Sequence, residues 1–288
     1  MLFIPSYDRR AGQGSQGDDL LSALGYHRGL MEKMGFDEFY EGLYAERWPA
    51  LRKALLAEPP SNSLSEGLLK PYYLDAASVS AACALEVQDG DRVLDLCAAP
   101  GGKSLVLAAA LGDGGSLVAN DRSSARRARL RRVLSQHLPP DLLDRVQVTS
   151  HDASRWGLHE SDAYDRVLID VPCSSERHVL TSAPHLAKWT SARTRHLAMQ
   201  AYAILAAGFA ALKPGGTLVY CTCTISPAEN DGVIAKLLKK QGERVLLVPP
   251  SAPCGEASEF GWIILPDRCE GLGPMYFARA RKIAGATG

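Results

Sequence analysis

Val93-Leu-Asp-Leu-Cys-Ala-Ala-Pro-Gly-Gly-Lys-Ser-Leu-Val-Leu107 is the stretch of sequence from which the fold is predicted. Its apolar start is typical of a buried strand, the glycine pair of a tight turn, and the residues from Lys103 onward of a helix. Gly101 and Gly102 lack the Cβ atoms that would keep a ligand off the backbone, and the helix start presents unpaired N–H groups. The pattern predicts a cofactor site. A strand-to-helix turn that binds nothing also needs glycine, so both interpretations stay open on this stretch alone.

The acidic residue that ends the next predicted strand favours the cofactor interpretation. Asp121 stands about 20 residues after Gly101, the spacing at which a doubly wound sheet places an acid beside a bound ribose. A carboxylate there can accept hydrogen bonds from two sugar hydroxyls. Asp121 also suits the N-cap of the helix that follows, and the two roles are compatible.

Strand and helix patterns alternate from about Asp75 onward. The predicted strands are Arg92–Ala98, Ser116–Asp121, Val146–Asp152, Tyr164–Val171 and Thr217–Thr222. The predicted helices are Ala76–Leu85, Lys103–Leu111, Ala125–Gln136 and Thr190–Leu212. This alternation predicts an α/β fold with a mostly parallel sheet that helices cover on both faces. The sheet is expected to be closed at one edge by two antiparallel strands, Gly261–Pro266 and Met275–Arg281.

The first part of the chain has a different pattern. A polar segment predicts a flexible arm, and helical patterns follow it, so the expected elements are the arm Met1–Asp18 and helices at Asp19–Met34, Phe36–Leu43 and Trp48–Glu58. We therefore expect residues 1–70 to form a flexible arm and a small helical N-terminal appendage, and residues 71–288 to form the main domain. Aromatic side chains mostly pack in cores, so a position under the main domain, rather than one stacked on RNA, is expected for Tyr72, Tyr73 and Leu74.

The composition is that of an ordinary globular protein. Of the 288 residues, 46% are hydrophobic and 22% are charged, and the 32 basic residues balance the 32 acidic ones. The net charge therefore neither indicates nor excludes a nucleic-acid partner. No apolar run approaches the ~18 residues of a membrane span and no signal segment is visible, so an intracellular protein without a membrane partner is expected.

The seven cysteines, an odd number, are expected to be reduced thiols. Cys221 and Cys223 are too close together for a Cys-x-x-Cys metal pattern and lack a second pair, so no zinc site is expected. A buried free cysteine is usually a small hydrophobe, the interpretation preferred for Cys83, Cys97, Cys254 and Cys269. Cys173 and Cys223 each stand at the mouth of a predicted strand beside a carboxylate or hydroxyls, which favours reactivity.

Chemically active side chains gather at the carboxyl ends of the predicted strands. Asp170-Val-Pro-Cys173 leaves one strand and Thr222-Cys-Thr224 leaves the next. Ligands of open α/β sheets bind beyond these ends. We therefore expect one crevice to be lined by Asp95, Asp121, Asp152, Asp170, Cys173 and Cys223.

Arginines are concentrated just after the second predicted strand. Six of them fall within eleven residues with no acid between them: Arg122, Arg126, Arg127, Arg129, Arg131 and Arg132. Such a run usually forms a solvated helix face. Its density also suits a track for RNA phosphates, and both interpretations stay open.

Together these motifs resemble those of the RNA cytosine-5 methyltransferases of the Nop/Sun family, which use S-adenosylmethionine. Asp95-Leu-Cys-Ala-Ala-Pro-Gly-Gly-Lys103 looks like that family's cofactor motif, Asp170-Val-Pro-Cys173 like its first catalytic motif, and Thr222-Cys-Thr224 like its second. Their order and spacing match from about Tyr72 to the end of the chain. The resemblance implies that residues 71–288 form a catalytic domain with a Rossmann-like S-adenosylmethionine-dependent methyltransferase fold.

The resemblance also implies roles for single residues. The cofactor would be held by Cys97, Ala98, Ala99, Pro100, Gly101, Gly102, Lys103, Asp121, Arg126, Asp152, Ala153 and Asp170. Asp121 would meet the ribose, and Asp152 with Ala153 the adenine. Cys223 would add to carbon 6 of the cytosine so that carbon 5 can accept a methyl group, Cys173 would assist release, and Asp170 would stabilise the base.

Two further segments, Glu46-Arg-Trp-Pro-Ala-Leu-Arg52 and Gly273-Pro-Met-Tyr-Phe277, look like the branch that acts on mitochondrial small-subunit ribosomal RNA and its mitochondrial tRNA relative. The expected substrate is therefore ribosomal RNA, with transfer RNA as the alternative. No separate RNA-binding module is recognisable, so RNA selection would rest on the N-terminal helices, the arginine-rich helix, a partner protein or the ribosomal subunit. The expected compartment is the cytoplasm, or the mitochondrial matrix in a eukaryote.

Two other functions compete with this one. A DNA cytosine-5 methyltransferase would share only the Pro-Cys motif and would use that cysteine as its nucleophile. A non-catalytic ribosome-assembly factor with the same fold would be expected to have lost its reactive residues. This chain retains all three of them: Asp170, Cys173 and Cys223.

Overall fold

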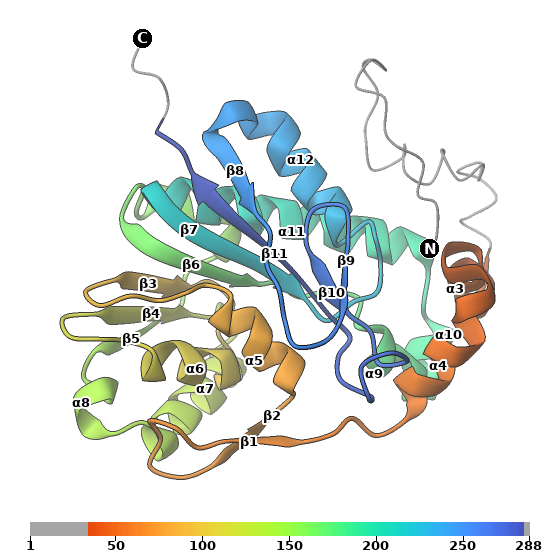
Figure 1. Ribbon diagram of the computed structural model, residues 1–288, viewed down its shortest axis with the longest axis horizontal. Coiled ribbons are helices and arrows are strands. Elements are labelled where there is room, and N and C mark those ends of the chain that lie inside the picture. The colour runs from red at the N-terminus through yellow and green to blue at the C-terminus, as the bar shows by residue number, and fades with distance from the viewer. Residues whose placement is uncertain (1–33, 285–288) are drawn as a thin grey trace.

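Five apolar segments form the parallel part of a nine-stranded sheet in the computed structural model, which describes residues 34–284 (Figure 1). From the edge inward the parallel strands are β5 (Val146–Thr149), β4 (Ser116–Asn120), β3 (Arg92–Asp95), β6 (Tyr164–Asp170) and β7 (Leu212–Thr222). Chain order thus reverses direction at β3, the first strand. A crevice forms where the order of an open sheet reverses, so the turn after β3 lies at the switch point of the fold.

The remaining strands close the other edge in antiparallel fashion. β11 pairs with β7, and short strands extend or flank it, with these bounds: β8 (Val245–Val248), β9 (Glu256–Ala257), β10 (Trp262–Ile264) and β11 (Met275–Lys282). The two predicted closing strands are therefore confirmed. The short strands β8 and β9 were not predicted.

Helices cover both faces of the sheet, as expected (Figure 1). One face packs against α5 (Ala76–Cys83), α6 (Gly102–Ala109) and α7 (Ser124–His137). The other packs against the 3₁₀ helix η2 (Ala153–Leu158), α11 (Ser191–Ala211) and α12 (Asp231–Gln241). Shorter helical turns are η1 (Ala45–Arg47), α8 (Pro140–Leu143), α9 (Glu176–Leu180), α10 (Ala183–Ala187) and η3 (Gly242–Arg244). Within residues 34–284, the helices are all too short or too polar to cross a membrane.

The N-terminal helices α3 (Phe36–Tyr44) and α4 (Trp48–Leu56) confirm two of the predicted helices, and Figure 1 shows them beside α9 and α10. They share one apolar core with α9 and with single residues that follow α10, β7 and β10: Val179, Leu180, Trp189, Ile225 and Leu265. Their aromatic side chains thus brace the carboxyl ends of the strands. The predicted arm and the helix Asp19–Met34 lie almost wholly outside the described residues, and the boundary near residue 70 stays a prediction.

A two-stranded ribbon, β1 (Asn62–Leu64) and β2 (Tyr72–Leu74), follows the N-terminal helices. Tyr72 and Leu74 are partly buried and pack against the main core, as predicted. Tyr73 has 68% of its surface exposed, so the prediction that it packs under the domain is wrong. Alternate residues of a strand point to opposite faces, which places Tyr73 on the outer face of the ribbon.

Candidate active site

The turn after β3 requires glycine at two positions because neighbouring side chains occupy the space where their Cβ atoms would lie. Gly101 has a φ of +118°, and a Cβ there would lie 3.1 Å from side-chain atoms of Leu130 and Val133 on α7. A Cβ on Gly102 would lie 2.9 Å from Leu74. The space where these Cβ atoms would lie is filled by the protein, which supports the packing interpretation of the glycines, and their place in a cofactor site stays a prediction. The turn does bring α6 close to β2 and α7, and it begins α6 without a side-chain cap, so the helix N–H groups stay available.

Asp95, which was expected to face the crevice, lies beneath the turn with 1% of its surface exposed. Its Oδ2 accepts a hydrogen bond of 2.7 Å from the Ser104 hydroxyl, and its buried Oδ1 has no hydrogen-bond partner among the described residues. Burial raises the pKa of this carboxyl to about 7, against the lowering effect of Ser104. Asp95 therefore supports the turn from inside rather than lining an open cleft.

Asp121 lies at the end of β4 and is joined to the glycine turn through Arg126. Its Oδ1 accepts from the backbone N–H of Ser123 at 2.8 Å, and its Oδ2 lies 3.4 Å from Nε of Arg126. Arg126 Nη2 donates to the carbonyl of Ala99 at 2.5 Å. The N-cap of α7 is Ser123, so the interpretation of Asp121 as that cap is wrong. The structure thus brings three predicted cofactor residues together.

Asp152 follows β5 at the same end of the sheet. It caps η2 by accepting hydrogen bonds from the Ser154 backbone N–H at 3.0 Å and hydroxyl at 2.8 Å. These bonds lower the pKa of the Asp152 carboxyl. Ala153 beside it is buried. Asp152 is partly exposed and charged, as a residue that meets a ligand must be.

Lys103 and Asp170 form an ion pair between the glycine turn and the exit of β6. Nζ lies 2.8 Å from Oδ2, and Oδ1 of the same carboxylate lies 3.6 Å from the Cys221 thiol. Burial acts to lower the pKa of Lys103, but the Asp170 charge outweighs it and the pKa is raised. Lys103 is therefore a fixed cation bound to Asp170 of the first catalytic motif. Sequence reasoning had placed it only among cofactor residues.

Cys173 and Cys223 meet at the exits of the neighbouring strands β6 and β7. Their sulfur atoms lie 3.3 Å apart, and both thiols are free. The hydrogen bond between them raises the pKa of Cys173, together with burial, and lowers the pKa of Cys223. Cys173 therefore keeps its proton and donates it, while Cys223 is the sulfur that ionises first.

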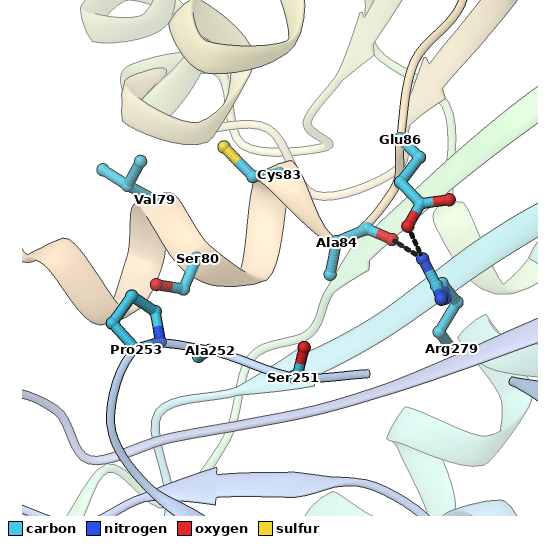
Figure 2. A pocket seen from close by; sticks show the side chains of 9 residues that line it. All are labelled: Val79, Ser80, Cys83, Ala84, Glu86, Ser251, Ala252, Pro253 and Arg279. Atoms are coloured by element: carbon cyan, nitrogen blue, oxygen red, sulfur yellow. Dashed lines mark hydrogen bonds and ion pairs between the residues drawn. The ribbon is translucent and has the colours of Figure 1, made fainter. Parts of the chain in front are cut away.

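The other cysteines are also free. Cys97, Cys221 and Cys269 are buried, Cys254 is half-buried and Cys83 is exposed. The interpretation as buried small hydrophobes is thus wrong for Cys83. Cys83 lines a cavity of about 360 Å³ between α5 and residues 251–253, in which Arg279 bonds to Glu86 and Ala84 (Figure 2). This cavity and a second one of about 190 Å³ at Trp156 include neither of the paired cysteines.

Sequence reasoning missed two buried acids next to the cysteine pair, Glu176 and Glu229. They have 0% and 1% of their surface exposed and bond to the hydroxyls of Ser174 and Thr224. The signal was present in the sequence. Glu176 stands three residues after Cys173, and Glu229 stands six after Cys223 in an otherwise uncharged segment.

Comparison with known proteins agrees with this geometry. The family model described as 16S rRNA methyltransferase RsmB/F matches residues 82–278. The 5-cytosine rRNA methyltransferase NSUN4 of Bos taurus is 40% identical over 244 residues, which are 77% of this chain and 62% of the relative. The mitochondrial tRNA (cytosine(34)-C(5))-methyltransferase of Mus musculus is 34% identical over 250 residues, 82% of this chain and 72% of the relative. The chain thus spans less than two thirds of the NSUN4 relative's length.

Solved structures show the same fold. The crystal structure of PH0851 superposes with a TM-score of 0.72 at 20% identity, covering 97% of this chain and 70% of that one. NSun6 from Pyrococcus horikoshii with SFG superposes with a TM-score of 0.63 at 26% identity, covering 77% of this chain and 55% of that one. The Rossmann-like methyltransferase fold and the resemblance to the Nop/Sun family are confirmed. The chain belongs to the 16S rRNA methyltransferase RsmB/F family.

Proposed function

We propose that this protein transfers a methyl group from S-adenosylmethionine to carbon 5 of a cytosine in RNA, through a covalent bond between Cys223 and the base. The observation that carries the proposal is the pair of thiols 3.3 Å apart beside the Lys103–Asp170 ion pair. The raised pKa of Cys173 and the lowered pKa of Cys223 support Cys223 as the sulfur that adds to the base. The activities of the relatives, cytosine-5 methylation of ribosomal RNA and of transfer RNA, support it.

The residues around the turn after β3 fit S-adenosylmethionine. That cofactor carries a positive sulfonium, an ammonium group and several hydroxyl and amino donors, so its site needs acceptors and negative charge. Three carboxylates stand at successive strand exits: Asp121, Asp152 and Asp170. A solved relative bound to SFG, an S-adenosylmethionine analogue, supports the fit.

The chain's own groups suit the two chemical stages. Cys223, the more acidic thiol, adds to carbon 6, and carbon 5 then takes the methyl group that bound S-adenosylmethionine supplies. While Cys223 is a thiolate, Cys173 donates its proton to the hydrogen bond between them. Once the Cys223 sulfur is bonded to carbon it no longer accepts this hydrogen bond, and Cys173 can release its proton to water. The Cys173 thiolate then takes the carbon 5 proton, the electrons of that C–H bond form the carbon 5–carbon 6 double bond, and the carbon–sulfur bond breaks to return the Cys223 thiolate.

Single substitutions of the two cysteines test this order of events. Cys223→Ala should abolish both methylation and any covalent protein–RNA species. Cys173→Ala should lose turnover but accumulate an adduct that survives denaturing electrophoresis, because the base is added and not released. An adduct formed by Cys223→Ala and absent from Cys173→Ala would reverse the two roles. Unimpaired methylation by both variants would show that neither thiol takes part in the reaction.

The substrate is proposed as small-subunit ribosomal RNA, with transfer RNA as the second candidate. Labelled S-adenosylmethionine incubated with ribosomal RNA, ribosomal subunits, transfer RNA and DNA separates them, and bisulfite sequencing then identifies the cytosine. Label in DNA alone would refute the proposal. A requirement for assembled subunits would show that a partner supplies RNA recognition. We propose the cytoplasm as the compartment, or the mitochondrial matrix in a eukaryote, in line with the mitochondrial relative.

A further inference from the structure

A buried group of hydroxyl and carboxyl side chains adjoins the two cysteines along the chain. We call it the carboxyl cluster, and its members are Ser174, Glu176, Thr224 and Glu229. Ser174 directly follows Cys173, and Thr224 directly follows Cys223. Any movement within the cluster is therefore passed to the sulfur atoms through one peptide bond on each side.

Ser174 is the centre of the cluster. Its Oγ lies 2.5 Å from Oε1 of Glu229 and 2.8 Å from Oγ1 of Thr224, and it also bonds to Oε1 of Glu176. Its backbone N–H donates to Oε2 of Glu229 at 2.9 Å. Thr224 Oγ1 donates to Glu176 at 2.9 Å. Ser174 thus links the exit of β6 to the segment that follows β7, through both its hydroxyl and its backbone N–H.

The number of protons in the cluster is informative. Four oxygen–oxygen contacts lie within the cluster: three join a hydroxyl to a carboxyl group and one joins the two hydroxyls. The two hydroxyls carry one proton each, and the Thr224 proton is directed to Glu176. The single Ser174 proton cannot serve Thr224, Glu176 and Glu229 at once, so a proton on a carboxyl group is needed as well. A cluster with both carboxyls ionised would leave two buried oxygens facing each other without a proton between them.

The missing proton belongs on Glu229. Glu176 is well supplied as an anion, because it also accepts from the Tyr40 hydroxyl at 2.5 Å and from the Ile225 N–H at 2.9 Å. Among the described residues the Glu229 carboxyl bonds to Ser174 alone, and burial together with the Glu176 charge raises its pKa to about 8. The titratable groups around it come from every neighbouring element: Tyr40, Cys173, Glu176, Tyr220 and Cys223.

We propose that Glu229, as a neutral carboxylic acid bonded to Ser174, is the positioning residue that holds Cys173 against Cys223. Its proton completes the cluster, and the completed cluster fixes the two strand exits at the separation the thiol pair requires. The catalytic meaning of this role rests on the proposed function. The role itself is a statement about sulfur geometry and can be tested in the protein alone.

The first test measures how fast the two thiols join. Diamide, a diazene oxidant, takes two electrons and two protons from the thiols, which form one sulfur–sulfur bond. Peptide mass spectrometry after alkylation reports the Cys173–Cys223 product. Glu229→Ala should slow its formation by about tenfold or more, because the sulfurs lose their enforced proximity. Glu229→Gln should stay within about twofold of the parent, since the amide still accepts from the Ser174 N–H and donates to its hydroxyl.

Controls separate this effect from general damage. The thiols of Cys254 and Cys269 are neighbours elsewhere in the fold and should join at an unchanged rate in the same samples. Glu160→Ala, which removes a glutamate bonded to Arg92 and Tyr164 instead, should leave the Cys173–Cys223 rate unchanged. If Glu229→Ala does not fold, Ser174→Ala removes the central hydroxyl and should slow the reaction similarly. An unchanged or faster Cys173–Cys223 rate in the folded variant overturns the proposal.

The second test uses methylation. Glu229→Ala should lower kcat by about tenfold or more with KM for RNA and cofactor within about twofold, and Glu229→Gln should restore kcat, since sulfur placement acts on the chemical step. A loss confined to KM, or a failure of Gln to rescue, would refute the positioning role. If the parent protein methylates no RNA, the proposed function fails, whereas the diamide rates still decide the inference.

Discussion

At the scale of single residues, buried carboxyl groups set the chemistry of this protein. Asp95 under the glycine turn and Glu229 behind the cysteines both have raised pKa values, of about 7 and about 8, with burial as the first cause. Their hydrogen-bond partners within residues 34–284 carry no charge: they are serine groups for both and, for Asp95, the Cys97 backbone N–H as well. Both are therefore held as neutral or shared-proton groups, whereas Lys103 and Asp170 beside the thiols form a charged pair.

Asp95 gives a pH-dependent prediction. Its pKa is raised from 3.8 unfolded to about 7 folded, so the folded state binds the proton more tightly. The stability it contributes is complete at low pH and is lost as pH rises from about 4 through about 7. Asp95→Asn stays neutral at every pH. The melting temperature of the variant minus that of the parent should therefore be more positive at about pH 8 than at about pH 5. Melting curves without cofactor check this, and a pH-independent difference would contradict it.

Asp121 gives a binding prediction. Its carboxylate is buried and anchored by Ser123 and Arg126, which leaves it oriented for hydroxyl donors. Asp121→Ala should weaken S-adenosylhomocysteine binding by about 1–3 kcal/mol, the cost of losing charge-assisted hydrogen bonds. Calorimetry measures it, with Asp141→Ala on the short helix α8 as a control. Equal affinities for Asp121→Ala and the parent would mean that Asp121 serves only the local turn.

At the scale of elements, α7 divides its arginines between two tasks. Arg126 reaches Ala99 and Asp121, and Arg127 Nη1 donates to the carbonyls of Asp121 and Arg122, so these two side chains hold the turn before the helix. Three others are exposed on the helix: Arg129, Arg131 and Arg132. On α7 the RNA-track interpretation therefore depends on these three, and Arg122, which precedes the helix and is also exposed, remains available to it. The solvated-face interpretation is its competitor.

The exposed arginines give a salt-dependence prediction. If they neutralise RNA phosphates, replacing all three by Gln should reduce the slope of log affinity against log salt by about 0.7 for each phosphate that is no longer neutralised. Filter binding or fluorescence anisotropy over a salt series measures this. The matched control replaces three exposed lysines on the opposite helical layer: Lys236, Lys239 and Lys240. Equal slopes in the two triple variants would favour the interpretation that the arginines of α7 form a solvated helix face and do not bind RNA.

At the scale of the whole molecule, the last strand joins the parallel part of the sheet to its antiparallel edge. β11 pairs with both β7 and β8, and near its end Lys282 is buried with 2% of its surface exposed. Its ammonium donates to the carbonyls of Phe209 at 3.0 Å and Leu212 at 2.6 Å, and to Asp162 at 2.7 Å. The Lys282 side chain thus supplies hydrogen bonds to acceptor oxygens at the end of α11, at the start of β7 and in the loop before β6.

Lys282 gives a stability prediction that is independent of catalysis. Lys282→Met keeps the apolar stem but leaves buried carbonyls unpaired, so the free energy of unfolding should fall by about 3 kcal/mol. Urea unfolding measures it, and cofactor affinity below the transition should be unchanged because the site lies at the other end of the strands. Arg281→Met, whose side chain is exposed on the same strand, should cost less than about 0.5 kcal/mol.

The sequence by itself determined the order of the long elements and the residues of the three motifs. Runs such as Leu94–Leu96 and Val167–Ile169 carry enough apolar residues to specify strands, and their order specifies a parallel sheet with ends on one side. It did not reveal several of the short elements, such as β9 and α9, because so few residues show no period and these segments lack a distinct apolar run. The longer α12 also went unpredicted, although Val233, Ile234 and Leu237 mark a helical face.

Only the tertiary structure decided which residues far apart in the chain contact one another. Gly101 and Gly102 are ordinary turn glycines in the sequence, and α7 and β2 determine that their missing Cβ atoms make room for protein side chains. Glu176 and Glu229 are 53 positions apart by number, and the pairing of β6 with β7 brings both onto one serine. A sequence pattern records local preferences, whereas the charge, proton count and separation of the two thiols depend on interactions that exist only after the sheet has formed.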